Sequence, residues 1–310
     1  MTSKKLKALL SRSDSCALVP GCNDALSCKL IEEAGFELAY FSGFALSACR
    51  LAMPDIGVAT YSEMLESARM CAEAVSIPII GDGDTGYGGL LNIRRTVHGY
   101  ARAGLAAISI EDQTFPKRCS YAHGASVVAF DEALERVRAA IRARDELASA
   151  EGVNILIVAR TDVIRCGGSS DRTDEVLEDA VRRCKAFEAS GADVVYAEGL
   201  TSPDAMRAIT SAVQVPTMLA QVEPSSGGGA PLLTTGEASA LGFRLLLRGV
   251  TLLNSYVAAT RRTLRALRGG AGGAGGLPPD LLPFDELCAA VGFEEAYAWE
   301  RGAAAVAPQQ

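Results

Sequence analysis

Short apolar runs alternate with longer amphipathic stretches along most of this chain. The runs that predict β-strands are Ala17–Pro20, Leu38–Ser42, Pro78–Asp82, Ala106–Glu111, Asn154–Arg160, Asp193–Glu198, Pro216–Gln221 and Phe243–Leu247. Between them, apolar residues recur at helical spacing and predict the helices Ala25–Ala34, Ser62–Val75, Ile93–Ala103, Asp131–Ala148, Asp174–Ser190 and Pro203–Val213. Glycines such as Gly35 and Gly104 stand where these helices end, as expected of C-terminal caps.

Eight strands that alternate with helices predict a parallel (β/α)8 barrel of the TIM type. The alternative is a doubly wound open sheet, but no phosphate loop or G-x-G-x-x-G motif opens a helix to favour it. We expect the catalytic barrel to span residues 1–268 and the glycine-rich stretch 269–280 to be a linker. Residues 281–310 would form a helical tail, whose apolar face must be buried on the barrel or, by exchange, on a neighbouring subunit.

Composition narrows the class of protein. The chain has 310 residues, is 49% hydrophobic and carries a net charge of −7, which supports a large core and argues against nucleic-acid binding. No apolar run is long enough to cross a membrane, and the basic start of the chain is too short and polar for a secretory signal, so we expect a cytoplasmic protein. The nine cysteines are odd in number and form no C-x-x-C pair, which argues against disulfides and zinc.

Polar residues gather at the C-terminal ends of the predicted strands, where (β/α)8 barrels carry their chemistry. These strand ends are Ser42-Gly43-Phe44, Asp82 with Asp84, Glu111-Asp112-Gln113, Arg160-Thr161-Asp162 and Glu198. Because the bodies of the same strands are apolar, the sequence predicts a functional site at this mouth.

Asp82 and Asp84 stand two residues apart after an apolar strand, so both side chains can point to one side. Carboxylate oxygens suit a hard cation such as Mg²⁺, and the glycines that follow let the backbone approach a ligand. Taken alone, this acidic turn is better explained by a solvated strand end than by a metal site. The other strand-end residues favour a metal site.

A long loop after the fourth strand carries Lys117-Arg118-Cys119, and its length suits a lid. Neighbouring cations lower the pKa of a thiol and raise its reactivity, so we expect a reactive Cys119. An incidental cysteine beside solvated charges is the alternative.

Several motifs together resemble those of the isocitrate lyase/phosphoenolpyruvate mutase superfamily. The matching segments are Phe41-Ser-Gly43, Leu51-Ala-Met-Pro-Asp-Ile-Gly57, Gly81-Asp-Gly-Asp-Thr-Gly-Tyr-Gly88, Ile110-Glu-Asp-Gln113, Pro116-Lys-Arg-Cys119, Ala159-Arg-Thr-Asp162 and Glu198. They occur in the family's order and spacing, and the resemblance extends from about Leu18 to Leu253.

The resemblance implies roles for individual residues. Asp84 would bind Mg²⁺ directly, with Mn²⁺ as an alternative, while Asp82 and Glu111 would hold metal-bound water. The catalytic residues would be Cys119 as the acid that protonates the departing carbanion, Arg160 on substrate oxygens, Asp55 near the reacting oxygen, Lys117 and Glu198. Those that bind substrate would be Ser42, Gly43, Phe44, Arg160, Ser120 and Gln221. The family also implies a homo-oligomer, a tetramer, with exchanged tail helices.

The chain departs from the family around the lid. Where the lyases have Lys-Arg-Cys-Gly-His, this chain has Lys117-Arg118-Cys119-Ser120-Tyr121, and Ser120 is a feature of the mutases. His123 replaces the missing histidine only if the lid shifts by two residues. Gln221 matches the family asparagine only with a one-residue gap.

These residues favour a Mg²⁺-dependent lyase that cleaves a carbon–carbon bond in a small 2-hydroxy di- or tricarboxylate of the 2-methylisocitrate or dimethylmalate type. A 2-oxo acid such as oxaloacetate would chelate the metal, and charge that develops on its oxygens would be stabilised by the metal and Arg160. The alternatives are an oxaloacetate hydrolase or decarboxylase, a mutase that forms P–C bonds, and a catalytically silent barrel.

Overall fold

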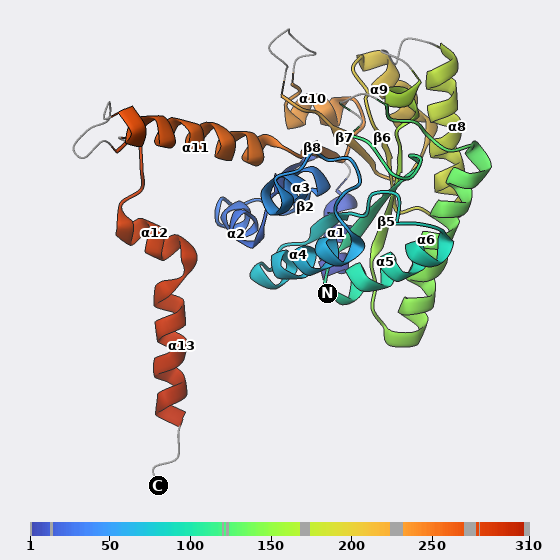
Figure 1. Ribbon diagram of the computed structural model, residues 1–310. Coiled ribbons are helices and arrows are strands. Elements are labelled where there is room, and N and C mark those ends of the chain that lie inside the picture. The colour runs from blue at the N-terminus through green and yellow to red at the C-terminus, as the bar shows by residue number, and fades with distance from the viewer. Residues whose placement is uncertain are drawn as a thin grey trace. The chain divides into compact units, whose positions relative to one another are not determined.

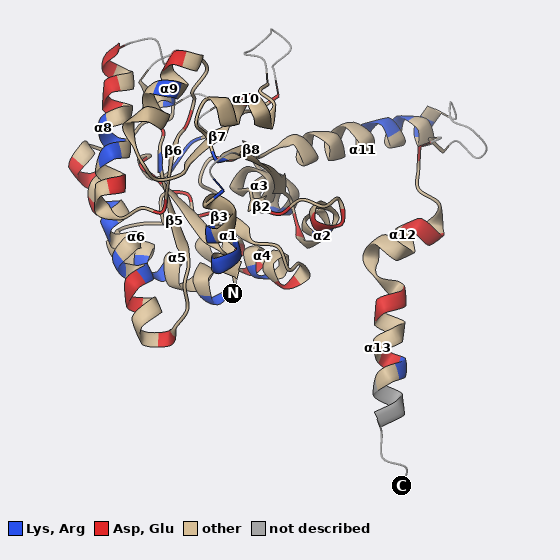
Figure 2. Ribbon diagram, turned by 180° about the vertical axis from the view of Figure 1, so that it is seen from behind, with Lys and Arg blue, Asp and Glu red and all other residues tan. Residues whose placement is uncertain are grey.

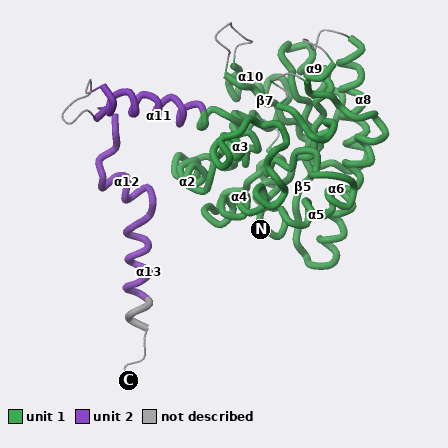
Figure 3. The backbone as a smooth tube through the Cα atoms, viewed as in Figure 1, with its two compact units in different colours: residues 1–253 green, residues 254–310 purple. Residues whose placement is uncertain are grey.

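The computed structural model describes residues 2–12, 15–119, 121, 124–167, 174–223, 232–269, 277–278 and 280–306. These residues form two compact units, residues 1–253 and 254–310 (Figure 3). The predicted 269–280 linker and Ser120 lie largely or wholly outside the described residues.

The first unit is a closed barrel of eight parallel strands in sequence order (Figure 1), which confirms the predicted fold. The strands are β1 Ala17–Cys22, β2 Ala39–Phe41, β3 Ile79–Asp82, β4 Ala107–Glu111, β5 Leu156–Thr161, β6 Val194–Ala197, β7 Thr217–Ala220 and β8 Leu245–Arg248. Pairing of β1 with β8, from Ala17 beside Leu245 to Pro20 beside Arg248, closes the barrel. The predicted strands lie within two residues of these bounds at each end.

Helices follow the strands around the barrel. They are α1 Thr2–Leu10, α2 Ala25–Glu33, α3 Gly43–Leu51, α4 Tyr61–Ala74, α5 Leu90–Arg102, α6 Phe130–Glu151, α7 Val163–Cys166, α8 Asp174–Ser190, α9 Pro203–Ala212, α10 Thr235–Ala240 and the first part of α11 Thr251–Gly269. Local sequence sets their starts: Thr60 accepts from the Glu63 N–H while Glu63 accepts from the Thr60 N–H, a capping box. Figure 2 shows acidic and basic residues interspersed along α6 and α8.

The core has two layers. One apolar cluster fills the space between the barrel and its helices, and a second fills the barrel interior. In the second cluster Leu6, Leu9 and Leu10 of α1 pack with residues at the starts of strands, such as Leu156 and Leu245. Helix α1, which sequence patterning did not predict, therefore closes the N-terminal end of the barrel and leaves the opposite mouth for the site.

The second unit contains the rest of α11 together with α12 Phe284–Val291 and α13 Phe293–Val306. The predicted helical tail is therefore two helices, divided at Gly292, whose φ of 89° lies in the left-handed region that favours glycine. Large apolar side chains of these helices are exposed, including Phe284 at 79% and Trp299 at 75%. None of the described helices has the length and apolar character needed to cross a lipid bilayer.

Candidate active site

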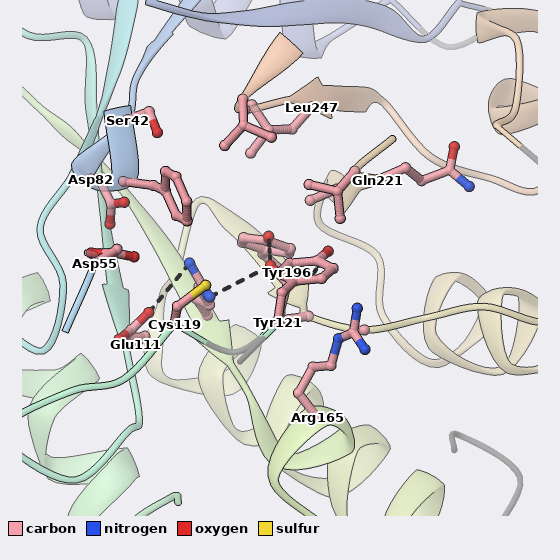
Figure 4. A pocket seen from close by; sticks show the side chains of 18 of the residues that line it. Ser42, Asp55, Asp82, Glu111, Cys119, Tyr121, Arg165, Tyr196, Gln221 and Leu247 are labelled. Atoms are coloured by element: carbon pink, nitrogen blue, oxygen red, sulfur yellow. Dashed lines mark hydrogen bonds and ion pairs between the residues drawn. The ribbon is translucent and has the colours of Figure 1, made fainter. Parts of the chain in front are cut away.

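A cavity of about 630 Å³ lies at the C-terminal mouth of the barrel (Figure 4). It is lined by most of the residues that the sequence singled out: Ser42, Phe44, Asp55, Asp82, Glu111, Lys117, Cys119, Arg160, Glu198 and Gln221. The structure thus brings together side chains that follow six different strands, as the strand-end argument predicted.

The two aspartates at the end of β3 are held by the backbone of β4. Gly83 N–H donates to Ser109 O at 2.9 Å, and Glu111 N–H donates to Asp84 O at 3.0 Å. Asp84 has a φ of 46°, a left-handed conformation that aspartate tolerates better than most residues. This turn places Asp84 beside Glu111, so carboxylates from two strands meet.

Position 43 favours glycine in this arrangement. Gly43 N–H donates to Asp82 Oδ2 at 3.1 Å, and a Cβ at position 43 would lie 3.0 Å from that oxygen and 3.3 Å from Asp84 Oδ1. The N-terminus of α3 thus contacts the carboxylates directly. Ser42 caps the same helix by accepting from the Ala45 N–H at 3.3 Å.

Lys117 crosses from the loop after β4 into this cluster. Its Nζ lies 2.5 Å from Asp55 Oδ1 and 2.8 Å from Asp84 Oδ1, and the ammonium is buried. Burial acts to lower the pKa of Lys117, but Asp84, Asp55 and Glu111 outweigh it and raise that pKa well above its ordinary value. Lys117 therefore remains charged.

The buried carboxylates repel one another. Burial and the charge of Asp84 raise the pKa of Asp82 to about 6, and burial raises the pKa of Glu111 well above its usual range. Glu111 Oε1 is buried and accepts no hydrogen bond from any described residue. These carboxylate oxygens have too few hydrogen-bond donors and positive charges around them, so the site is suited to a cation.

A hydrated divalent cation fits these residues better than a fully dehydrated one. Among the described residues, no three carboxylate, imidazole or thiol groups are arranged to hold a metal ion directly. Mg²⁺ retains several waters and is bound through one or two carboxylates, so the requirement for three protein ligands does not apply to it. The unpaired Glu111 oxygen and the buried Asp82–Asp84 pair offer carboxylate oxygens to such a hydrated ion.

Arg160 links the carboxylates to the other side of the cavity. Its guanidinium donates to both Asp162 oxygens at 2.8 and 2.9 Å and lies 3.3 Å from Glu111 Oε2 and 3.5 Å from Glu198 Oε2. The same group lies over the ring of Tyr196. Asp162 in turn is fixed by its N–H, which donates to Asp112 Oδ1 at 2.9 Å.

The expectation that Cys119 has a lowered pKa is wrong, although Lys117 acts in the predicted direction. Burial is the largest influence and raises that pKa. A hydrogen bond with the Tyr121 backbone lowers it, Asp55 raises it, and Lys117 and Arg160 lower it, but burial outweighs them. Cys119 is accordingly a protonated thiol at neutral pH.

Tyr121 takes part in the site from the lid loop. Its hydroxyl donates to Glu198 Oε1 at 2.7 Å, and Tyr196 donates to the other oxygen of Glu198. The Arg165 guanidinium lies 4.0 Å from the centre of the Tyr121 ring. Tyr196 and Arg165 were not predicted, although the position of Arg165, three residues beyond the Arg160-Thr161-Asp162 strand end, is the kind of βα loop that carries function in barrels. His123 lies outside the described residues.

Gln221 lines the cavity, but described residues also contact its amide oxygen. Leu233 N–H donates to Gln221 Oε1 at 2.9 Å and Arg248 donates to it at 3.1 Å. In Figure 4 the Gln221 amide lies on the side of the cavity away from Asp82. The Ser225–Gly229 stretch, which departs from the family pattern, lies outside the described residues.

Known proteins resemble both the sequence and the fold. A family model described as phosphoenolpyruvate phosphomutase matches residues 6–268. The 2,3-dimethylmalate lyase of Eubacterium barkeri is 34% identical over 246 residues, which cover 79% of this chain and 79% of that protein. The structure of oxaloacetate acetylhydrolase with the inhibitor 3,3-difluorooxalacetate has a TM-score of 0.86 and 34% identity over 98% of this chain and 97% of that one. Phosphonopyruvate hydrolase in complex with oxalate and Mg²⁺ has a TM-score of 0.81 and 30% identity over 97% and 98%.

Proposed function

The chain belongs to the phosphoenolpyruvate mutase family, within the isocitrate lyase/phosphoenolpyruvate mutase superfamily, and we propose that it cleaves a carbon–carbon bond in a small 2-hydroxy di- or tricarboxylate. It is an enzyme of the carboxylate lyase type. The observation that carries the proposal is the position of the Cys119 thiol, which lines the same cavity as the buried carboxylates and Arg160; burial also raises the pKa of this thiol and so favours its protonated form.

We propose that Asp84 holds Mg²⁺ directly and that Asp82 and Glu111 hold it through water, with Mn²⁺ as a substitute. The buried carboxylates with an unpaired oxygen support this assignment. The ion would stabilise negative charge that develops on substrate oxygens. Ser42, Gly43 and Phe44, at the N-terminus of α3, are proposed to bind the substrate carboxylate nearest the metal site, with Ser120 and Gln221 contacting other parts of the substrate.

The proposed cleavage removes the proton from the 2-hydroxyl, converts the C2–O bond to a carbonyl and breaks the C2–C3 bond, with its electron pair moving to C3. Asp55, 2.5 Å from Lys117, is proposed to accept the hydroxyl proton. Cys119 then donates its proton to the C3 carbanion. The thiolate that remains is stabilised by Arg160 and Lys117 and later takes a proton from solvent, and Asp55 releases to solvent the proton that it accepted. Glu198, between two tyrosine hydroxyls, helps to position Arg160.

Hydrolysis or decarboxylation of oxaloacetate is the second candidate, favoured by the likeness to oxaloacetate acetylhydrolase. The test is a product screen by NMR with Mg²⁺ present, over isocitrate, 2-methylisocitrate, dimethylmalate, oxaloacetate, citramalate and phosphonopyruvate. A lyase releases a 2-oxo acid together with a second carboxylate from one of the hydroxy acids. Turnover of oxaloacetate alone would favour the second candidate, conversion of phosphonopyruvate would favour a mutase or a phosphonopyruvate hydrolase, and no turnover of any compound would favour a silent barrel.

We also propose that residues 1–268 are the catalytic part of a cytoplasmic homotetramer that binds neither nucleic acid nor membrane. Residues 281–310 would pack on a partner subunit. The exposed apolar side chains of α12 and α13 support this, because Phe284, Leu287, Phe293 and Trp299 are each at least 45% exposed within the chain. Light scattering should show an oligomer for the full chain and a smaller species after truncation at Arg268. A full-length monomer at micromolar concentration would contradict this assembly.

A further inference from the structure

One arginine in the cavity differs from the others in its partners. Lys117 and Arg160 pair with carboxylates, and Arg118 donates to the carbonyl oxygens of Ile56 and Lys117. Arg165 also lines the cavity, yet it forms no ion pair with any carboxylate that the structure describes. Its Nε is buried and has no hydrogen-bond partner among the described residues. A partly buried cation in this state favours a negatively charged ligand.

The surroundings hold Arg165 in place. Its guanidinium stacks at 4.0 Å on the ring of Tyr121, whose hydroxyl is fixed by Glu198. Its aliphatic stem lies against Gly199, where an added Cβ would be 2.6 Å from Arg165 Cγ. Gly199 has a φ of 98°, so both its conformation and the space beside it suit glycine. An arginine whose stem and ring-stacked face are both fixed loses little freedom when it binds a carboxylate.

The position of Arg165 indicates which part of a substrate it can reach. In Figure 4 Asp55, Asp82 and Glu111 lie on one side of the cavity, and Arg165 lies with Gln221 on the other. Cys119 lies between the two sides, and Arg160 contacts Glu111 at 3.3 Å and Glu198 at 3.5 Å. A ligand whose 2-hydroxy acid end occupies the carboxylate side therefore directs its remaining substituents toward Arg165.

We propose that Arg165 determines substrate specificity by binding a second carboxylate, on the half of the substrate that leaves as the carbanion. This rests on the proposed function, since it assumes that the reacting end lies near Asp84 and Glu111. A guanidinium pairs with a carboxylate through two parallel hydrogen bonds, so a substrate with a neutral group there leaves the arginine without its partner. The site is then selective for di- and tricarboxylates over monocarboxylates.

Malate and lactate provide the test, because they share a 2-hydroxy acid end and differ in the distal carboxylate. Oxalate reports on the carboxylate side alone. Calorimetry with Mg²⁺ present gives the affinity of each ligand for the native protein, Arg165→Gln, Arg165→Lys and the control Arg207→Gln. Arg207 is an exposed residue of α9. Hydrogen bonds to charged groups predict that Arg165→Gln weakens malate binding by about 10- to 100-fold.

The native protein should bind malate more tightly than lactate, and Arg165→Gln should remove that preference without changing the affinity for oxalate. Arg165→Lys should keep part of the preference, and Arg207→Gln should keep all of it. Equal weakening of malate, lactate and oxalate by Arg165→Gln would assign Arg165 a structural role and overturn the inference. An unchanged malate-to-lactate ratio would overturn it as well, while leaving the proposed function intact. If the native protein bound none of the three ligands, the proposed function would fail and this inference with it.

Discussion

The two sides of the cavity are built in different ways. On the carboxylate side, defined by Asp55, Asp82, Asp84 and Glu111, Lys117 pairs with two of the acids at 2.5 and 2.8 Å and Arg160 contacts a third. On the arginine side, defined by Tyr121, Arg165 and Gln221, the described residues leave the Arg165 cation without a carboxylate partner. The first side carries more carboxylates than Lys117 and Arg160 can neutralise, so a cation can balance it, and the second carries a positive charge that an anionic ligand can balance.

The difference follows from the backbone that supports each side. The carboxylates Asp82 and Glu111 are at the ends of paired strands, and backbone hydrogen bonds from Gly83 and Glu111 fix their register. Tyr121 and Arg165 come from a lid loop and from the four-residue helix α7. Loops vary with less effect on the barrel. We infer that the carboxylate side serves chemistry shared by the family and that the arginine side selects the substrate.

The largest effect is expected from the carboxylate side. Asp84→Ala removes the proposed direct Mg²⁺ ligand and leaves Lys117 with one fewer carboxylate, so turnover should fall below detection. Chelation should inactivate the native enzyme, and added Mg²⁺ should restore it. Asp204→Ala, at a fully exposed position of α9, is the matched control and should be active. Full activity in excess chelator would contradict the assignment.

The next largest effect concerns Cys119, between the two sides. A serine hydroxyl is a much weaker acid than a thiol, so Cys119→Ser should lower kcat by about 10²–10⁴-fold with little change in substrate binding. Steady-state kinetics with the substrate from the product screen measures this loss. Cys49→Ser, at an exposed thiol, is the control.

A mutase releases no carbanion, so the same substitution would cost a mutase little. His123→Ala separates the remaining possibilities. If Cys119→Ser retains turnover and His123→Ala loses it, the acid is the histidine. If both variants retain turnover, the proposed lyase mechanism is wrong.

Sequence alone predicted the barrel and the carboxylate side because both depend on regular spacing. Alternation of strands and helices fixes a (β/α)8 barrel, and its geometry brings strand-end residues such as Asp82 and Glu111 to one mouth. Helix α1 was missed because a nine-residue basic segment at a chain end gives no sign of where its leucines pack. The raised pKa of Cys119 was missed because it depends on burial.

Arg165 shows the limit of sequence reasoning more sharply. Arg165 lies in helix α7 and contacts Tyr121 and Gly199, which are 44 and 34 positions away along the chain. No periodicity or motif relates these positions. Such contacts become visible only when the barrel brings these segments together.

A smaller effect is expected at Tyr121. Tyr121→Phe keeps the ring that stacks on Arg165 and removes the hydrogen bond to Glu198, which Tyr196 still supports. Because Tyr121 is 40% exposed, water can replace part of this bond, and kcat/KM should fall by about tenfold or less. Tyr256→Phe, at an exposed tyrosine of α11, is the control. A loss as large as that of Cys119→Ser would show that Tyr121 takes part in proton transfer and that the two sides are not separate in function.

The last effect is on stability and concerns Asp112, which lies behind Arg160. Asp112 supports Asp162, and through it Arg160, while burial raises the pKa of Asp112 to about 6 from an ordinary value of 3.8. A raised folded-state pKa means that this group stabilises the fold below pH 4 and that its contribution is lost as the pH rises through 6. At about 1.4 kcal/mol per pH unit, the loss approaches roughly 3 kcal/mol.

Asp112→Asn resembles the protonated side chain at every pH. The other titratable groups are the same in the variant and in the native protein, so their contributions cancel when the stabilities of the two proteins are compared. Between pH 4 and pH 8, the native protein should therefore lose stability relative to Asp112→Asn, as measured by urea unfolding at each pH. Arg183, which pairs with Asp112 at 3.0 Å, stays charged throughout and contributes a constant difference. A stability difference that does not change over this range would show that Asp112 remains ionised without cost. The support behind Arg160 would then be a fixed ion pair with Arg183, independent of pH.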